Sequence, residues 1–105
     1  MKIIFMGTPD FAVPTLDKLF NSKHQISAVV TATDKASGRG QKVKYSAVKK
    51  YALKNNIPIL QPNSLSSEQF KNDLINLKAD IYIVVAFRIL PKKIFSIPQY
   101  GSINA

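Results

Sequence analysis

Few side chains in this sequence of 105 residues are of a type that usually carries acid–base or nucleophilic catalysis. There is no cysteine, and the single histidine, His24, falls in a polar connection after the first predicted helix. A zinc site usually needs three or four protein ligands, and Ser-His-Asp or Cys-His mechanisms need a histidine beside the nucleophile. We therefore expect no metal site and no nucleophilic mechanism of these kinds.

Asp10, Asp34 and Asn104 are the other candidates for chemistry, because each lies near the end of a predicted strand. A mechanism with paired carboxylates would need the two acids to converge. Asp10 is better explained as an acid at a helix start, which the helix dipole favours, and Asp34 as a loop residue. Asn104 could donate its side-chain amide to a developing oxyanion, an interaction worth about 3–4 kcal/mol in favourable cases. Such an amide would still need a second group to supply a proton.

Basic residues are concentrated in one part of the chain, which has a net charge of +9 from 15 Lys and Arg against 6 Asp and Glu. No acidic residue occurs between Lys35 and Ser67. This stretch contains Lys35, Arg39, Lys42, Lys44, Lys49, Lys50 and Lys54. Such a patch favours a polyanion, most often nucleic acid. A lysine-rich surface without a specific partner would give the same count.

Short apolar runs alternate with helical spacings along the chain. The runs predict strands at 2–6, 26–31, 58–62, 81–86 and 102–104, and the spacings predict helices at 10–21, 46–55, 66–77 and 92–96. Ser46 is expected to cap one helix, and Ser66 with Gln69 to form a capping box. The prolines around 58–62 suit an edge strand. This alternation predicts an α/β fold with a doubly wound, mostly parallel sheet.

In sheets of this kind, ligands bind outside the carboxyl ends of the strands. Three segments are expected there, namely 7–10, 87–91 and Asn104. Residues 33–45 are expected to form a long polar loop, and loops of this length are often functional. The turn at 7–10 has one glycine and a proline without an N–H group, so it lacks the donors of a nucleotide phosphate cradle.

Membrane and export signals are not found in the sequence. No stretch approaches the roughly 18 apolar residues of a membrane span. The apolar run at the N-terminus is too short for a signal peptide. We therefore expect a cytoplasmic protein.

Four segments together resemble a known family: "MKIIFMGTPDFAVPTLDKL", "TDKASGRGQKVKYSAVKKYA", "IPILQP" and "ADIYIVVAFRILPKKIFSIPQYGSIN". They are similar, in register, to the methionyl-tRNA formyltransferases. The resemblance implies a Rossmann-like formyltransferase fold. It also implies transfer of a formyl group from 10-formyltetrahydrofolate, as cosubstrate, to the amino group of methionyl initiator tRNA. Neither a metal nor a nucleotide cofactor is implied, and the full-length enzyme is expected to be a monomer.

The resemblance also implies roles for individual residues. The catalytic asparagine of the family corresponds to Asn104. The pterin of the donor is expected in a pocket lined by the turn after the fourth strand, here Phe87, Arg88, Ile89 and Leu90. This turn is shorter than the Ala-Tyr-Gly-Leu-Ile-Leu-Pro of many members, so either Phe87 or Arg88 could take the place of the usual residue. The tRNA acceptor end is expected to meet the basic loop through Arg39, with Lys35, Lys42 and Lys44 as companions.

The remaining catalytic groups of the family, a histidine and an aspartate, would lie beyond Ala105. We therefore expect residues 1–105 to be the N-terminal portion of the catalytic domain, truncated before its last strands and without the C-terminal tRNA-binding barrel domain. On this expectation the 105-residue chain alone is inactive, because catalytic groups act as a unit. Two alternatives stay open. One is a formyltransferase of the same fold that acts on an amino-sugar nucleotide or other small amine, and the other is a non-catalytic RNA-binding α/β module.

Overall fold

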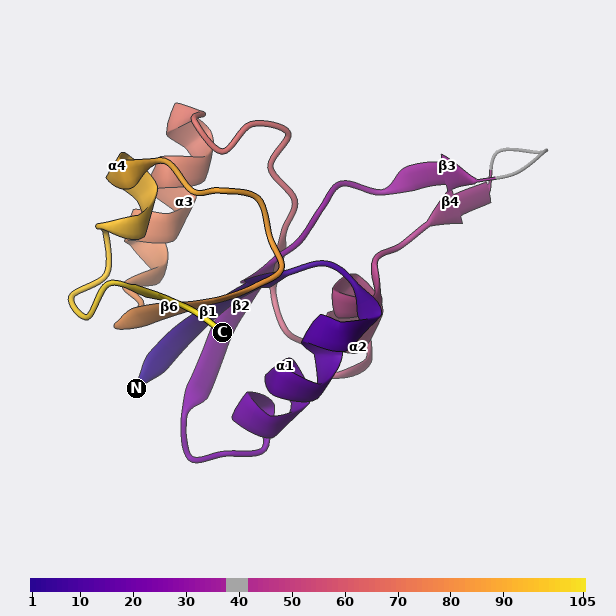
Figure 1. The fold of residues 1–105 in the computed structure, drawn as a ribbon, viewed down its shortest axis with the longest axis horizontal. Helices are drawn as coiled ribbons and strands as arrows, with labels where there is room; N and C mark the ends of the chain where they lie inside the picture. Colours follow the sequence, from indigo (N-terminus) through magenta and orange to yellow (C-terminus); the bar gives the residue numbers. More distant parts are fainter. Residues whose placement is uncertain (38–41) are drawn as a thin grey trace.

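The computed structural model describes residues 1–37 and 42–105. A five-stranded sheet forms its centre, with helices on both faces and a two-stranded hairpin that projects away from it (Figure 1). The strands of the sheet are β1 (Lys2–Gly7), β2 (Gln25–Val30), β5 (Ile59–Leu60), β6 (Ile81–Val85) and β7 (Ser102–Asn104). The helices are η1 (Asp10–Ala12), which is a 3-10 turn, α1 (Val13–Phe20), α2 (Ala47–Lys54), α3 (Glu68–Leu77) and α4 (Lys92–Phe95).

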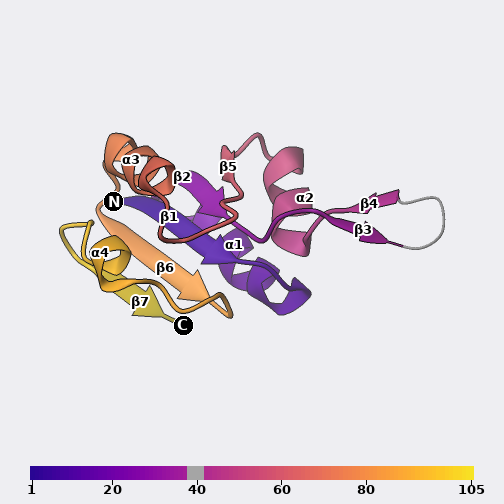
Figure 2. The same ribbon diagram turned by 90° about the horizontal axis from the view of Figure 1, so that it is seen from above.

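All strands of the sheet pair in parallel, in the order β5-β2-β1-β6-β7 (Figure 2). The chain moves outward from β1 through β2 to β5 and then returns to β6, on the other side of β1. This reversal is the topological switch point of a doubly wound sheet. The predicted fold class is therefore confirmed, as is the prediction of an edge strand at 58–62.

The two apolar faces of β1 explain why helices cover both sides of the sheet. Ile3 and Phe5 belong to the core cluster that includes residues of α1 and α2, whereas Ile4 and Met6 belong to the cluster that includes residues of α3 and α4. None of the four is more than 3% exposed. Because successive strand residues point to opposite faces, a strand that is apolar at every position needs cover on both.

Gly7 ends β1 at a point where no larger residue fits. A Cβ atom added there would lie 2.9 Å from the carbonyl oxygen of Val85 and 3.1 Å from the Cβ of Ala12. Contacts this short require the neighbours to move, and the first neighbour is the backbone of β6. The glycine therefore lets β1 pair closely with β6 while the following turn packs against η1.

Serine side chains cap α2 and α3. The Oγ of Ser46 accepts the backbone N–H of Lys49 at 3.0 Å, as the sequence predicts. The capping box predicted at Ser66 and Gln69 is wrong by one residue, because the N-cap of α3 is Ser67. Ser66 belongs instead to the preceding turn, where its N–H donates to the Oγ of Ser64 at 3.2 Å. The side chain of Gln69 donates to Asp73 at 2.7 Å.

The segment between β2 and α2 differs most from the prediction. In place of a polar loop over 33–45, β3 (Lys35–Ser37) and β4 (Lys42–Lys44) form an antiparallel hairpin. Strands of three residues carrying lysines have no run of apolar alternation that would reveal them in the sequence. Arg39 belongs to residues 38–41, which lie outside the described residues.

Tyr82 of β6 is fully buried in the cluster on the α3 and α4 side. Its hydroxyl has no hydrogen-bond partner among the residues that the structure describes. Burial raises the pKa of Tyr82 to about 12, so the hydroxyl stays neutral near pH 7. A buried polar group without a partner costs about 1–3 kcal/mol of stability.

We therefore expect Tyr82→Phe to raise the free energy of unfolding by about 1 kcal/mol, because it removes the unpaired oxygen and keeps the ring. Urea unfolding of both forms measures the difference. Tyr100→Phe is the control, since that side chain is 59% exposed and should leave stability unchanged. A loss of stability in Tyr82→Phe would contradict the interpretation that the hydroxyl is unpaired.

Candidate functional site

The carboxyl ends of β1, β6 and β7 meet at one edge of the sheet because these strands are parallel neighbours. The arrows of the three strands in Figure 2 point in the same direction. Each of the segments 7–10 and 87–91 includes or follows the end of one of these strands, and Asn104 ends the third. The topology therefore brings to one edge the segments that the sequence places there.

Asn104 and the turn after β6 line the same cavity, which has a volume of about 350 Å³ and is called the Asn104 pocket below. Its lining comprises Val84, Phe87, Arg88, Ile89, Leu90, Phe95, Ser102 and Asn104. All four residues predicted for a pterin site are included. Five of the eight lining residues are apolar, and Arg88, Ser102 and Asn104 supply polar groups. A mixture of this kind is typical of pockets for small organic molecules.

The turn after β6 begins at Ala86, whose backbone φ of 50° lies in the left-handed region that residues other than glycine seldom adopt. Phe87 is half-buried and packs against the core cluster on the α3 and α4 side. Arg88 is exposed, and its guanidinium donates to the carbonyl of Pro62 at 3.2 Å and lies 5.2 Å from the ring of Phe87. Ile89 is 95% exposed. Phe87 thus anchors the turn on the core, while Arg88 ties it to the segment after β5.

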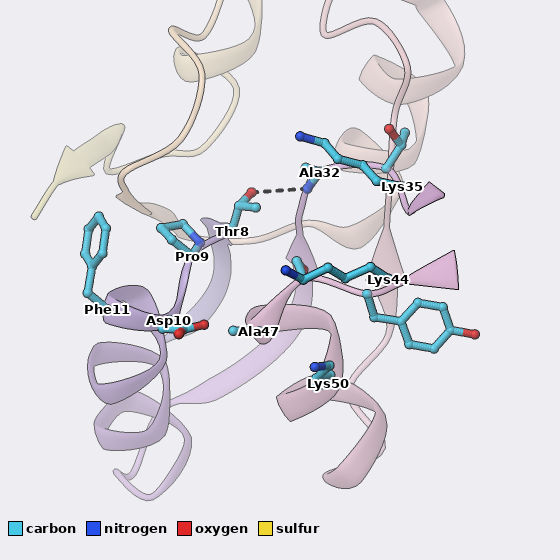
Figure 3. Close-up of a pocket in the computed structure, with 12 residues that line it drawn as sticks. Thr8, Pro9, Asp10, Phe11, Ala32, Lys35, Lys44, Ala47 and Lys50 are labelled. Carbon is cyan, nitrogen blue, oxygen red and sulfur yellow. Dashed lines mark hydrogen bonds between the residues drawn. The ribbon is translucent and has the colours of Figure 1, made fainter. Parts of the chain in front are cut away.

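A second cavity, of about 480 Å³, lies between the turn after β1 and the base of the hairpin (Figure 3). We call it the hairpin cavity. Its lining comprises Thr8, Pro9, Asp10, Phe11, Ala32, Thr33, Lys35, Lys44, Tyr45, Ser46, Ala47 and Lys50. The predicted residues Lys35 and Lys44 are among them. Nothing in the sequence distinguishes Lys50 from the other basic residues, or selects Phe11, whose ring is exposed beside the cavity.

The lysines of the hairpin share one face. Lys35 of β3 lies directly opposite Lys44 of β4, and both ammonium groups extend towards the turn after β1 in Figure 3. Lys42 is two residues from Lys44 and therefore lies on the same face, whereas Ala36 and Val43 pair on the other. Like charges directly opposite each other destabilise a strand pair. An anion bound at this basic face would offset that repulsion.

Asp10 and Asp34, the two acids near strand ends, have different surroundings. Asp10 lines the hairpin cavity. The carboxylate of Asp34 lies 2.7 Å from the ammonium of Lys49 and accepts the side-chain N–H of Gln61 at 2.8 Å. The paired-carboxylate mechanism is therefore not supported, and Asp34 is engaged in contacts within the protein.

His24 directly precedes β2, so it lies at the amino-terminal end of the parallel strands, whereas both cavities lie at their carboxyl ends. Its Nδ1 is 3.0 Å from the amino group of Met1, which precedes β1 at the opposite edge of the sheet. Within residues 1–37 and 42–105, no group of three or more His, Cys, Asp and Glu side chains is placed to hold a metal ion. No helix in this part of the chain is both long and apolar enough to cross a membrane.

The hydrogen bond from Lys49, with a second from Gln61, holds the pKa of Asp34 below its ordinary value of 3.8. The ion pair is therefore present at neutral pH and is lost only as the pH falls through this lowered pKa. We expect Lys49→Met to move the NMR titration midpoint of the Asp34 carboxyl upwards. Lys18→Met, on α1, should leave the midpoint where it is. An unchanged midpoint in Lys49→Met would show that the pair does not form in solution.

Comparison with known proteins shows several relatives of this chain. A family model described as "Formyl transferase" matches residues 1–105. The methionyl-tRNA formyltransferase of Flavobacterium johnsoniae is 52% identical over 104 residues, which are 99% of this chain and 33% of that protein. The protein of the same name from Alkaliphilus oremlandii is 51% identical over 105 residues, 99% of this chain and 34% of that protein.

The corresponding protein of Bacteroides thetaiotaomicron is 47% identical over 104 residues, 99% of this chain and 32% of that protein. The chain thus spans about a third of the length of the curated relatives that it matches. The family match extends over every residue of the chain and confirms the resemblance stated from the sequence. The chain therefore belongs to the formyl transferase family.

Proposed function

We propose that this protein transfers a formyl group from 10-formyltetrahydrofolate to the amino group of methionine on initiator tRNA, in the initiation of translation. The observation that carries the proposal is the position of Asn104 in one pocket with Phe87, Arg88, Ile89 and Leu90. The names of the relatives support it. The resemblance alone leads us to propose a monomeric, cytoplasmic enzyme.

The proposed role of Asn104 is to bind the oxygen of the formyl group. As the amine of methionine attacks the formyl carbon, this oxygen gains negative charge, and an amide N–H donates a stronger hydrogen bond to it. The new carbon–nitrogen bond forms at the amine, the bond to N10 of the folate breaks, and a proton moves from the amine to N10. The apolar side chains of Ile89 and Leu90 suit the pterin of the donor, which is flat and largely apolar on its faces.

The proposed role of the hairpin is to bind the phosphates of the acceptor end. Lys35, Lys42 and Lys44 lie on one face of it. Lysine binds phosphate as a point charge, and release of counterions from the RNA makes such binding weaken with salt. For Arg39 the role stays a prediction from the sequence, and Arg39→Ala is expected to slow transfer to tRNA.

Neither alternative function accounts for both the basic face of the hairpin and the Asn104 pocket. A small amine, such as an amino-sugar nucleotide, offers few phosphates for a face that carries three lysines. A non-catalytic RNA-binding module would use the hairpin but has no need for the Asn104 pocket. This pocket is separate from the hairpin cavity, because the two share no lining residue. Binding of a folate analogue would count against this second alternative.

We expect Asn104→Ala in the full-length protein to lower kcat by about 10²–10³, because it removes a donor to the developing oxyanion. The Kd for initiator tRNA should not change, since the hairpin is untouched. Steady-state formylation and an RNA-binding titration measure the two quantities. Asn63→Ala is the matched control, because this exposed asparagine lies in the loop after β5 and does not line the Asn104 pocket. A kcat that stays near the unmodified value would remove Asn104 from the mechanism.

We expect Lys35→Ala and Lys44→Ala each to reduce the slope of log affinity against log salt by about 0.7–0.9 if each lysine contacts one phosphate. The measurement is a titration with initiator tRNA at several salt concentrations. Lys18→Ala, on α1, serves as the control and should keep the slope of the unmodified protein. Slopes that are the same in all variants would exclude these lysines as phosphate contacts.

A further inference from the structure

Lys49 lies where both legs of the hairpin join the body of the protein. Its ammonium is 2.7 Å from the carboxylate of Asp34, which directly precedes β3, and 4.0 Å from the ring centre of Tyr45, which directly follows β4. The side chain of Lys49 is only 13% exposed. One cation on the first turn of α2 therefore contacts the start and the end of the hairpin at the same time.

Further hydrogen bonds close the base of the hairpin. The hydroxyl of Thr31, which follows β2, is 2.7 Å from that of Ser46, the N-cap of α2. Thr31 is fully buried. This hydrogen bond directly links the points at which the chain leaves and rejoins the body of the protein. The contacts of Lys49 with Asp34 and Tyr45 provide a second link, closer to the hairpin strands.

Gln61 ties Asp34 to the sheet as well. Its side-chain N–H groups donate to the Asp34 carboxylate at 2.8 Å and to the carbonyl of Ala32 at 3.0 Å. Because Gln61 directly follows β5, the carboxylate is held from two separate elements, α2 and the end of β5. A hydrogen-bonded carboxylate with two partners has far fewer orientations than a free one.

We propose that Asp34 and Lys49 are positioning residues that set the direction of the basic face of the hairpin, and that Lys49 is not itself a phosphate contact. The inference rests on the proposed function of that face. Lys49 stands among the seven basic residues between 35 and 54, but its charge is paired within the protein. Lys35, the first lysine of the face, directly follows Asp34 in the chain. A change in the backbone orientation at Asp34 therefore also changes the orientation of Lys35.

A positioning role for Asp34 and simple charge counting predict opposite changes in the affinity for RNA. Asp34→Asn removes a negative charge beside a surface that is proposed to bind RNA, and on charge alone this change would tighten binding. If the carboxylate holds the hairpin in place, the same change weakens binding because the basic face is no longer held in one orientation. The sign of the effect therefore separates positioning from electrostatics.

The test uses the full-length protein with methionyl initiator tRNA as the probe. We expect Asp34→Asn and Lys49→Met each to weaken binding three- to fivefold, in the range typical of a partly exposed ion pair. Lys49→Met should leave the salt slope unchanged, in contrast to Lys35→Ala, because no phosphate contact is lost. Lys49→Arg retains the cation at the same position and should restore most of the affinity.

Asp73→Asn on α3 is the matched control, because it removes the same charge from a side chain that contacts Gln69 and lies outside the base of the hairpin. Charge counting predicts that it tightens binding slightly or has no effect. Unchanged or tighter binding in Asp34→Asn would overturn the proposal.

A second measurement needs no RNA and so separates this proposal from the proposed function. Amide hydrogen exchange at 35–37 and 42–44 should become three- to fivefold faster in Asp34→Asn and Lys49→Met and stay unchanged in Asp73→Asn. Equal exchange in all forms would overturn the positioning role even if the protein binds tRNA. If exchange changes as expected but the unmodified protein does not bind tRNA, the hairpin is held as described and the proposed function is wrong.

Discussion

The parallel pairing of β1 with β6 is the contact on which the rest of the structure depends. These strands lie at the centre of the sheet. The strands β2 and β5, which precede β6 in the chain, lie on one side of this pair, and β7 lies on the other. Gly7 permits the pairing because a side chain there would meet the carbonyl oxygen of Val85. The pairing places the ends of β6 and β7 beside the turn after β1, so the Asn104 pocket and the hairpin cavity open at the same edge.

Each side of this pairing supplies a different part of the proposed reaction. β6 and β7 carry the Asn104 pocket, with the group proposed to stabilise the transition state and the apolar surface proposed for the donor. β1 and β2 lead to the hairpin cavity, with the lysines proposed for the acceptor. Separate lining residues allow the acceptor side to be altered without loss of the donor side, as expected in a fold whose loops carry the function.

Much of the fold could be predicted because it depends on local patterns. The continuous apolar run at 81–86 indicates a strand covered on both faces, and parallel strands place their carboxyl ends together. Asn104 and Phe87 can therefore be assigned to one edge of the sheet from the sequence alone. The hairpin could not be predicted, since its strands are short and its lysines show no apolar alternation.

The role proposed for Lys49 could not be predicted from the sequence either. Charge counting groups it with Lys35 and Lys44, and only the three-dimensional contacts with Asp34 and Tyr45 distinguish it from them. The same holds for Lys50 and Phe11, which reach the hairpin cavity from α2 and from the turn before α1. Contacts between residues far apart in sequence leave no periodic signal, so side chains of one type at similar spacings can have different functions.

The function proposed for this protein is the transfer of formyl groups to an aminoacylated RNA. The most direct measurement supplies the full-length protein with 10-formyltetrahydrofolate and offers methionyl initiator tRNA and an amino-sugar nucleotide in separate reactions. We expect formylation of the methionyl-tRNA and none of the amino-sugar nucleotide. Formylation of the amino-sugar nucleotide alone, or of neither acceptor, would contradict the proposed function.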